Sequence, residues 1–392
     1  MALLIFSILF VLAAATLLLR LRTSRPPLPN PAPLGEKSGL ESGSDGSITP
    51  PKVSGEGINE PVDIKIESLT DFDWAMAEPE KHRPFKPTYH ITMALKNTTP
   101  SDLIQIDKNY LSRITNRKAI VRDHQSTVMG YIPEGVPAVY EVYEYLLGTY
   151  LPSRFPTMFS LQTSSSPSGP VTTFHNHVTS LVSPLSPPPS DPSTALRIIS
   201  QTIEDDFFLL QLQPPDSTSF PNEHKAVAFI CCHPAGFDPS TKLAQGLKAI
   251  HVPVPSYSKI GPSMERFFAR TTVDKPVKRL NWSVQTHTEL FSPGMNHVHA
   301  EEADKVERDV EVDIEQARMR VELQTLTRLA RTGALMFSFK TYLYGLDEIK
   351  GEGLGGELAD AIEGLGKGNA PGMWVYKGGI RWGKRVCEYL RS

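Results

Sequence analysis

Residues 207–232 read FFLLQLQPPDSTSFPNEHKAVAFICC and contain two short apolar runs that decide the fold class. The runs Phe207–Gln213 and Ala226–Cys232 have the length of β-strands and are bounded by proline and polar residues, so both predict strands. A third run, ALMFSFKTYL at Ala334–Leu343, follows the helix stop Thr332-Gly333 and predicts another strand.

Two other stretches have the spacing of helices. The stretch VPAVYEVYEYLLGTYL at Val136–Leu151 places Val139, Val142 and Leu146 on one face, and Glu315–Leu329 combines helical spacing with many charges. Helices and strands in this order predict an α+β fold in which helices flank an antiparallel sheet.

Charge and cysteine content exclude several classes of protein. Lys and Arg number 40 against 43 Asp and Glu, so the net charge of −3 provides no basic field for nucleic acid. The 392 residues are 40% hydrophobic, which is enough to bury a core in one large domain or two smaller ones. Three cysteines without a C-x-x-C motif exclude a disulfide scaffold and a zinc ribbon, and they favour a reducing compartment.

The N-terminal residues 1–22 predict a transmembrane signal-anchor. Ala2–Leu19 is an uncharged apolar run of 18 residues, close to the roughly 20 that a spanning helix needs. A cleaved signal peptide is the alternative, with Ala13–Ala15 as the cleavage site. Positive charges follow the run and none precedes it, which predicts a single-pass protein of the endoplasmic reticulum whose folded part faces the cytosol. These charges are Arg20, Arg22 and Arg25.

Composition divides the rest of the chain. Residues 23–59 are rich in Pro, Gly and Ser and predict a disordered linker, so the folded domain is expected at residues 60–392. Within that domain, residues 164–193 are a second low-complexity segment and predict a flexible loop. His175 and His177 lie inside it, where a flexible loop would give a metal no fixed geometry.

Several motifs of catalytic or cofactor sites are absent, and others are weak. There is no nucleotide loop, no hydrolase nucleophile elbow and no four-cysteine iron–sulfur spacing, so any redox chemistry needs electrons from another polypeptide. Asp71-Phe72-Asp73 behind an anchor and stem allows a luminal glycosyltransferase as an alternative. His297 and His299 with Glu301 or Glu302 allow a metal site, and an exposed acidic loop explains the same residues.

His251 is the main candidate for a cofactor ligand. It lies between Ile250 and Val252, and Pro253 and Pro255 are expected to hold the backbone extended and stiff. A histidine in such a place is either a satisfied core residue or an axial haem ligand, because imidazole suits iron.

Seven stretches in a consistent order resemble the haem-dependent oxidative N-demethylase family, of the dimethylamine monooxygenase alpha-subunit type. The likeness covers most of residues 84–343 apart from 164–193, here behind a membrane anchor. The stretches are ITMALKNTTPSDLIQIDKNYLSRITNRKAIV (91–121), LPSRFPTMF (151–159), EDDFFLLQL (204–212), KLAQGLKAIHVPVPSY (242–257), MERFFAR (264–270), RLNWSV (279–284) and VELQTLTRLARTGALMFSFKTYL (321–343).

The resemblance implies a PAS-like haem-binding domain that activates oxygen and oxidises an N-methyl group of an amine or another small organic substrate. Electrons would come from NADPH through a separate flavin and iron–sulfur reductase. A haem-based sensor that binds oxygen without turnover is the alternative, because PAS-like folds often serve as sensors.

The resemblance also assigns roles to single residues. His251 would be the axial iron ligand, Arg279 would pair with a haem propionate, and Trp282 would either line the haem pocket or belong simply to the core. Many relatives have an Arg before the Gln-Thr-Leu of the last stretch, whereas this chain has Glu322 and Leu323 there, which argues against dimethylamine as the substrate. Other candidate ligands are His224, His233, Cys232, His287, His297 and His299.

Overall fold

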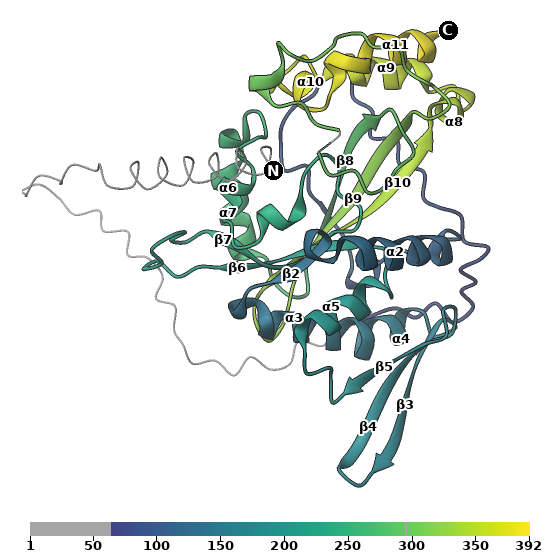
Figure 1. Cartoon of the computed structure of the whole chain (residues 1–392), viewed down its shortest axis with the longest axis vertical. Coiled ribbons are helices and arrows are strands. Elements are labelled where there is room, and N and C mark those ends of the chain that lie inside the picture. Colours follow the sequence, from purple (N-terminus) through teal and green to yellow (C-terminus); the bar gives the residue numbers. More distant parts are fainter. Residues whose placement is uncertain (1–63, 295) are drawn as a thin grey trace, which may run out of the picture. The chain divides into compact units, whose positions relative to one another are not determined.

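The larger of two antiparallel sheets organises the molecule (Figure 1). The computed structural model describes residues 64–294 and 296–392. The sheet has seven strands in the order β1-β8-β9-β10-β6-β7-β2. Their bounds in that order are Lys96–Asn97, Val277–Gln285, Arg318–Arg328, Leu335–Gly345, Asp206–Leu212, His224–Ile230 and Met129–Tyr131. The α+β class and the expected strands at 207–213, 226–232 and 334–343 are therefore confirmed.

The expected helix at Glu315–Leu329 is wrong, because most of this stretch is strand β9. Successive residues of a strand point to opposite faces. Val321 and Leu323 lie in a hydrophobic core, whereas the alternate residues Glu322 and Gln324 line a cavity on the other face. The alternate residues of β9 therefore face a core on one side and a cavity on the other.

The helices pack on both faces of this sheet. Met336 and Leu209 join residues of α2, α3 and α5 in one core, and Leu335 and Leu210 join Phe268 of α7 in a core on the opposite face. The helices are α2 (Tyr110–Val128), α3 (Val136–Glu144), α4 (Leu151–Arg154), α5 (Pro192–Ser200), α6 (Leu247–Ile250), α7 (Gly261–Arg270), α8 (Leu346–Gly351), α9 (Gly355–Gly364), α10 (Met373–Tyr376) and α11 (Gly379–Arg391).

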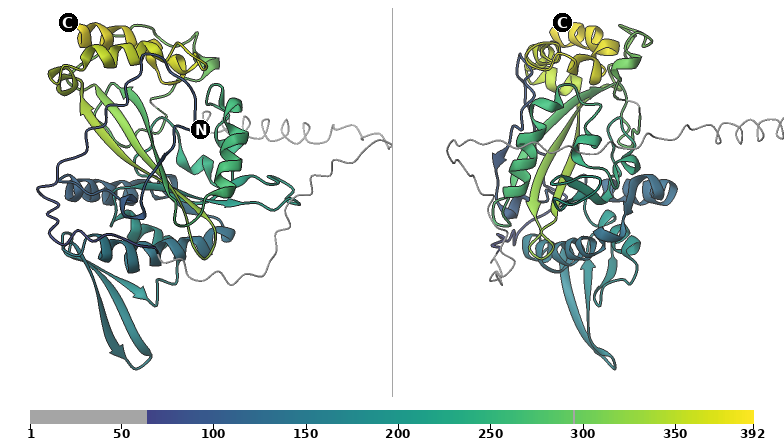
Figure 2. Two further views of the ribbon diagram at one scale, coloured as in Figure 1. Left: turned by 180° about the vertical axis from the view of Figure 1, so that it is seen from behind. Right: turned by 90° about the vertical axis from the view of Figure 1, so that its left-hand side faces the viewer.

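Two groups of helices mark the two ends of the long strands. Figures 1 and 2 show α8 to α11 gathered at one end of β8, β9 and β10, while α2, α3 and α5 lie near the other end. The helix expected at Val136–Leu151 is confirmed as α3, a π-helical turn at Tyr145–Tyr150 and the start of α4.

Residues 164–193 are not a loop but belong largely to a second sheet of three strands. Its strands β3 (Phe159–Ser166), β4 (Gly169–Asn176) and β5 (Leu181–Ser186) pair in that order, and Figures 1 and 2 show β3 and β4 extending away from the helices. The hydroxyl groups of Thr163 and Thr172 lie 3.0 Å apart across β3 and β4. Threonine is a good strand former, so the Ser-rich and Pro-rich composition was misleading.

Buried ion pairs lie beneath the large sheet. Arg117 of α2 places a guanidinium nitrogen 2.6 Å from Asp206 Oδ1, and both side chains are almost completely buried. Lys340 of β10 makes a second buried cluster, with its Nζ 2.7 Å from Asp107 and 3.1 Å from Glu204. These pairs tie α2 and the segment before it to the central strands.

Asp205 gives this region a pH-dependent stability. Burial raises its pKa from 3.8 to about 7, Lys340 opposes this rise, and the Asp205 Oδ2 atom has no hydrogen-bond partner among the described residues. Between those pH values the folded protein keeps a proton on Asp205 that the unfolded chain has lost. The contribution of Asp205 to the free energy of unfolding is therefore greatest below about pH 4 and falls as the pH rises toward 7. Other carboxylates act in the opposite sense at low pH.

We therefore expect the Asp205→Asn variant to lose less stability than the wild type between pH 5 and pH 8. Urea unfolding at several pH values measures the difference, and Asp73→Asn on the surface is the control. A pH dependence that is identical in wild type and Asp205→Asn would contradict the prediction.

The N-terminal expectations concern residues outside the described ranges. The anchor at 1–22 and the linker at 23–59 both lie there. Within residues 64–294 and 296–392, no helix combines the length and apolar character that crossing a membrane requires.

Candidate functional site

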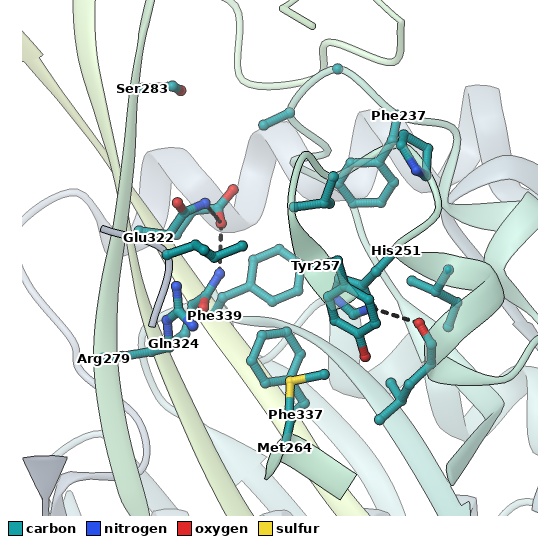
Figure 3. Close-up of a pocket in the computed structure, with 18 of the residues that line it drawn as sticks. Phe237, His251, Tyr257, Met264, Arg279, Ser283, Glu322, Gln324, Phe337 and Phe339 are labelled. Atoms are coloured by element: carbon teal, nitrogen blue, oxygen red, sulfur yellow. Dashed lines mark hydrogen bonds between the residues drawn. The ribbon is translucent and has the colours of Figure 1, made fainter. Parts of the chain in front are cut away.

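A cavity of about 520 Å³ lies between the large sheet and the segment that contains α6 and α7 (Figure 3). This volume falls within the range of about 300 to 1,000 Å³ that is usual for small-molecule and cofactor sites. Helical and loop residues cover it, and strands β6, β8, β9 and β10 form its floor. The floor residues are Phe208, Leu210, Val277, Arg279, Asn281, Arg320, Glu322, Gln324, Leu326, Phe337 and Phe339.

The register of the strands divides this floor into an apolar part and a polar part. Leu326 pairs with both Val277 and Phe337, so this part of the floor is apolar. Toward the N-terminal end of β9, Gln324 pairs with Arg279 and Glu322 pairs with Asn281. These four residues form the polar part of the floor.

His251 belongs to the cover of the cavity and lies at the C-terminal end of the short helix α6. The backbone there is not extended as expected, because the His251 N–H donates to the Leu247 carbonyl in a helical turn. The ring of His251 stacks on Tyr257, with centroids 4.5 Å apart and an angle of 3° between the planes. Pro253 and Pro255 follow in turns after the helix.

A hydrogen bond fixes the tautomer of His251. Its Nδ1 lies 2.7 Å from the Leu247 carbonyl oxygen, which can only accept, so Nδ1 holds the proton and Nε2 has a free lone pair. Burial lowers the pKa of His251 and keeps the ring neutral. A neutral imidazole with one nitrogen bound to a carbonyl is the form in which histidine ligates metals.

Arg279 points from β8 toward the cavity (Figure 3). Among the described residues it makes no ion pair, and its Nε has no hydrogen-bond partner. Burial lowers the pKa of the guanidinium, while Tyr89 and Glu322 act in the opposite direction. A desolvated guanidinium is favourable only with an anion beside it, so Arg279 suits a ligand that brings a carboxylate.

Glu322 and Lys377 complete the polar end of the cavity. Glu322 Oε2 accepts hydrogen bonds from Asn281 and from Gln324. Lys377, directly after α10, donates to Asn281 Oδ1 and to the Trp282 carbonyl. Strand β1 pairs only with the first two residues of β8, so the Trp282 carbonyl lies on an edge without a strand partner, where Lys377 binds.

Trp282 borders the cavity, but its side chain belongs mainly to the hydrophobic core. It pairs with Val321 of β9, and both rest in the core cluster that includes residues of α9 and α11. Its position alternates with those of Arg279 and Asn281 along β8. The structure therefore brings His251 and Arg279 to the cavity and places the indole of Trp282 at its border.

The competing candidate ligands have other environments. Cys232 and His233 are buried, and neither lines the cavity; burial raises the pKa of the Cys232 thiol to about 12. His224 Nδ1 lies 2.6 Å from Glu265 and is thus already paired.

Two residues of the cavity lining, Tyr257 and Lys377, were not expected from the sequence, whereas His297 was among the candidate ligands. His297 stacks on Tyr376 with centroids 4.3 Å apart, and burial lowers its pKa to about 3. His297, Tyr257 and Lys377 all line the cavity, although their side chains come from segments of unremarkable pattern. No group of three potential metal-ligating side chains occurs within residues 64–294 and 296–392, so His297 and His299 do not form the metal site considered above with glutamates.

The Asp71-Phe72-Asp73 motif has a local structural role. Asp73 Oδ1 accepts a hydrogen bond from the backbone N–H of Ala75, and Phe72 packs on Phe155. Asp73 therefore stabilises its own turn, and Phe72 contributes to the contact with the end of α4.

Comparison with known families identifies the part of the chain that contains this cavity. Residues 94–387 match a family model described as haem-dependent oxidative N-demethylase, alpha subunit-like. The match includes His251, Arg279, Glu322 and Lys377, and it extends beyond residue 343, where the last of the seven similar stretches ends.

Proposed function

The chain belongs to the haem-dependent oxidative N-demethylase, alpha-subunit-like family, and from this membership we propose that it is a haem-dependent monooxygenase of small amines or related organic molecules. The observation that supports the proposal most directly is the cavity of about 520 Å³ with the neutral imidazole of His251 at its cover. We also propose that the haem-binding part of the chain has a PAS-like fold.

The residues around the cavity fit a haem group. His251 would ligate the iron through Nε2, since Nδ1 is occupied by the Leu247 carbonyl. Phe208, Phe337 and Phe339 provide an apolar surface for the macrocycle. Arg279, which has no anion among the described residues, would pair with a haem carboxylate.

The protein's own contribution to the chemistry is binding and orientation. Haem supplies the activation of oxygen when it is bound, and electrons would come from NADPH through a separate flavin and iron–sulfur reductase. The aromatic floor excludes water from the site, and the polar end at Glu322 and Gln324 can orient a small substrate by hydrogen bonds.

Two measurements test the proposed function. The purified chain should show a Soret band after reconstitution with haem, and with a reductase it should oxidise NADPH in proportion to an added methylamine while releasing formaldehyde. A protein that takes up haem and binds oxygen but never couples NADPH oxidation to an amine would be a haem sensor instead. A protein that takes up no haem would contradict the proposal as a whole.

Arg279→Ala is expected to weaken haem retention by about 10-fold or more, the range for a hydrogen bond between charged groups. The measurement is transfer of haem to apomyoglobin from the wild type and the variant. Arg279→Lys keeps the charge and should retain haem better than Arg279→Ala. Equal transfer rates for wild type and Arg279→Ala would exclude the role with the haem carboxylate.

We also propose, from the sequence, that residues 1–22 anchor the protein in the endoplasmic reticulum with residues 60–392 in the cytosol. A tag at Ser392 should then be digested when protease is added to intact microsomes. Glycosidase-sensitive modification at Asn97 would contradict this orientation. Asn281 is no usable acceptor for a glycan, because its amide is bound to Glu322 and Lys377 inside the fold.

A further inference from the structure

A series of hydrogen bonds joins the C-terminal helices to the polar end of the cavity. Lys377 Nζ lies 3.0 Å from Asn281 Oδ1, and Asn281 Nδ2 lies 3.3 Å from Glu322 Oε2. Gln324 Nε2 lies 3.0 Å from the same carboxylate oxygen. The series therefore runs from the end of α10, across the edge of β8, to the middle of β9.

The ammonium group of Lys377 determines how the amide of Asn281 is oriented. An ammonium group has donors only, so the atom of Asn281 that faces it must be the carbonyl oxygen. The amide nitrogen of Asn281 then faces Glu322 and donates to it, as Gln324 also does. Glu322 Oε2 is consequently an acceptor from both neighbours.

One oxygen of Glu322 remains available to a ligand. Both amides bind Oε2, and Oε1 receives no hydrogen bond from the residues that the structure describes. The nearest cation, Arg320 Nε, lies 3.9 Å from Oε1, beyond hydrogen-bond distance. The two Nη atoms of Arg320 are bound elsewhere, to the His233 and Leu290 carbonyls, to Gln285 and to Thr341, while its Nε has no hydrogen-bond partner among the described residues.

The largely buried carboxylate of Glu322 would be stabilised by a positive group that lies closer than Arg320 and donates a hydrogen bond. Glu322 is 8% exposed and lines a largely aromatic cavity, where a charge without a hydrogen-bonded counter-charge is costly. A protonated amine supplies both the positive charge and an N–H donor. A quaternary ammonium ion supplies the charge alone, and a neutral molecule supplies at most the donor.

We infer that Glu322 holds the protonated nitrogen of the substrate, and that Lys377 is a positioning residue that orients this carboxylate through Asn281. The inference rests on the proposed function and specifies its substrate class: small amines that retain at least one N–H when protonated. It also gives the C-terminal helices a role in recognition, since Lys377 follows α10 directly.

The first experiment compares two cations of similar size. Trimethylammonium and tetramethylammonium chloride are titrated into the full chain and followed by calorimetry and by ligand-observed NMR. The wild type should prefer trimethylammonium, because only this cation donates to Glu322 Oε1. Glu322→Gln keeps the shape of the side chain, and it should bind trimethylammonium about 10- to 100-fold more weakly and lose the preference.

The second experiment tests positioning. Lys377→Met keeps the length of the side chain and should weaken trimethylammonium binding about 3- to 10-fold, because the bond that orients Asn281 is lost, with Lys377→Arg restoring it in part. Lys278→Met is the matched control, because Lys278 is a lysine of β8 itself that alternates with Arg279 and lies outside the cavity lining. Thermal unfolding of each variant shows whether the fold is retained.

A pH profile separates positioning from a merely structural role. Burial lowers the pKa of Lys377 to about 8, with Arg279 acting in the same direction and Glu322 opposing it. The other groups facing Lys377 are the rings of Tyr89 and Trp282, and His297, whose pKa Lys377 helps to lower. A neutral lysine can accept as well as donate, so the amide of Asn281 is no longer fixed. Wild-type affinity should therefore fall above about pH 8, and Lys377→Arg should move this fall to higher pH.

The outcomes distinguish the inference from the proposed function. Unchanged trimethylammonium binding in Glu322→Gln would overturn the inference, whether or not the protein takes up haem. Weakened binding in Glu322→Gln together with unchanged binding and pH profile in Lys377→Met would overturn the role of Lys377. Failure to bind haem would overturn the proposed function alone, since the titrations compare variants of the protein as purified.

Discussion

The His251→Ala variant is expected to fold and to lose most of its haem. Removal of a second-shell partner of a metal ligand already lowers metal affinity by about 10- to 100-fold, and removal of the ligand itself should cost at least as much. The structural reason is that the Leu247 carbonyl holds the ring in the tautomer whose Nε2 is free to ligate a metal. Haem content per chain and the position of the Soret band measure the effect.

Imidazole provides a direct control for His251→Ala. It should enter the space beside Tyr257, where the ring of His251 normally stacks, and restore a Soret band close to that of the wild type. His297→Ala is the matched variant, because His297 also lines the cavity and stacks on a tyrosine. If His251→Ala binds haem fully with an unshifted spectrum, the ligand is another residue, and His297 becomes the first candidate.

Asp206→Ala is expected to have the largest effect on stability, a loss of about 3 to 5 kcal/mol in the free energy of unfolding. Asp206 accepts three bonds at once, from Arg117 and from the backbone N–H groups of Cys232 and His233. Its removal leaves the completely buried Arg117 guanidinium without a counter-charge. Urea unfolding measures the difference, and haem-free protein should be used so that ligand binding does not contribute.

The chain contains an exposed ion pair with nearly the same N···O distance, which serves as a control. Arg122 and Asp123 approach to 2.7 Å, compared with 2.6 Å for Arg117 and Asp206, but both side chains of the control are exposed. Asp123→Ala should therefore change stability little, because exposed ion pairs are screened by water and salt. Similar losses for Asp123→Ala and Asp206→Ala would show that burial does not set the strength of the pair.

The strands that could be predicted are those whose side chains are apolar on both faces. This holds for β6, β7 and β10, which lie between helices or the cavity and a core. Strand β9 was not predicted because Met319, Leu323 and Leu326 also have the spacing of a helix face. Strands β3 to β5 were not predicted because their hydroxyl side chains and prolines resemble a linker.

The site could be predicted only in part. His251 and Arg279 lie in two of the stretches that resemble the family, and both line the cavity. The stack of His251 on Tyr257 and the bond between Lys377 and Asn281 depend on the tertiary fold, and the latter joins residues 96 positions apart. No local pattern signals such a contact, because nothing near Lys377 in the sequence indicates a partner on β8.

The order of strands in the large sheet has a consequence for synthesis on the ribosome. Strand β10 joins β9 to β6, so before residues 335–345 are made the chain has two partial sheets, β1-β8-β9 and β6-β7-β2, with no strand between them. The cavity floor spans this junction, and Lys377 is made later still. The nascent chain therefore cannot complete the floor of this cavity until residues 335–345 have been translated, so the cavity forms only after both partial sheets exist.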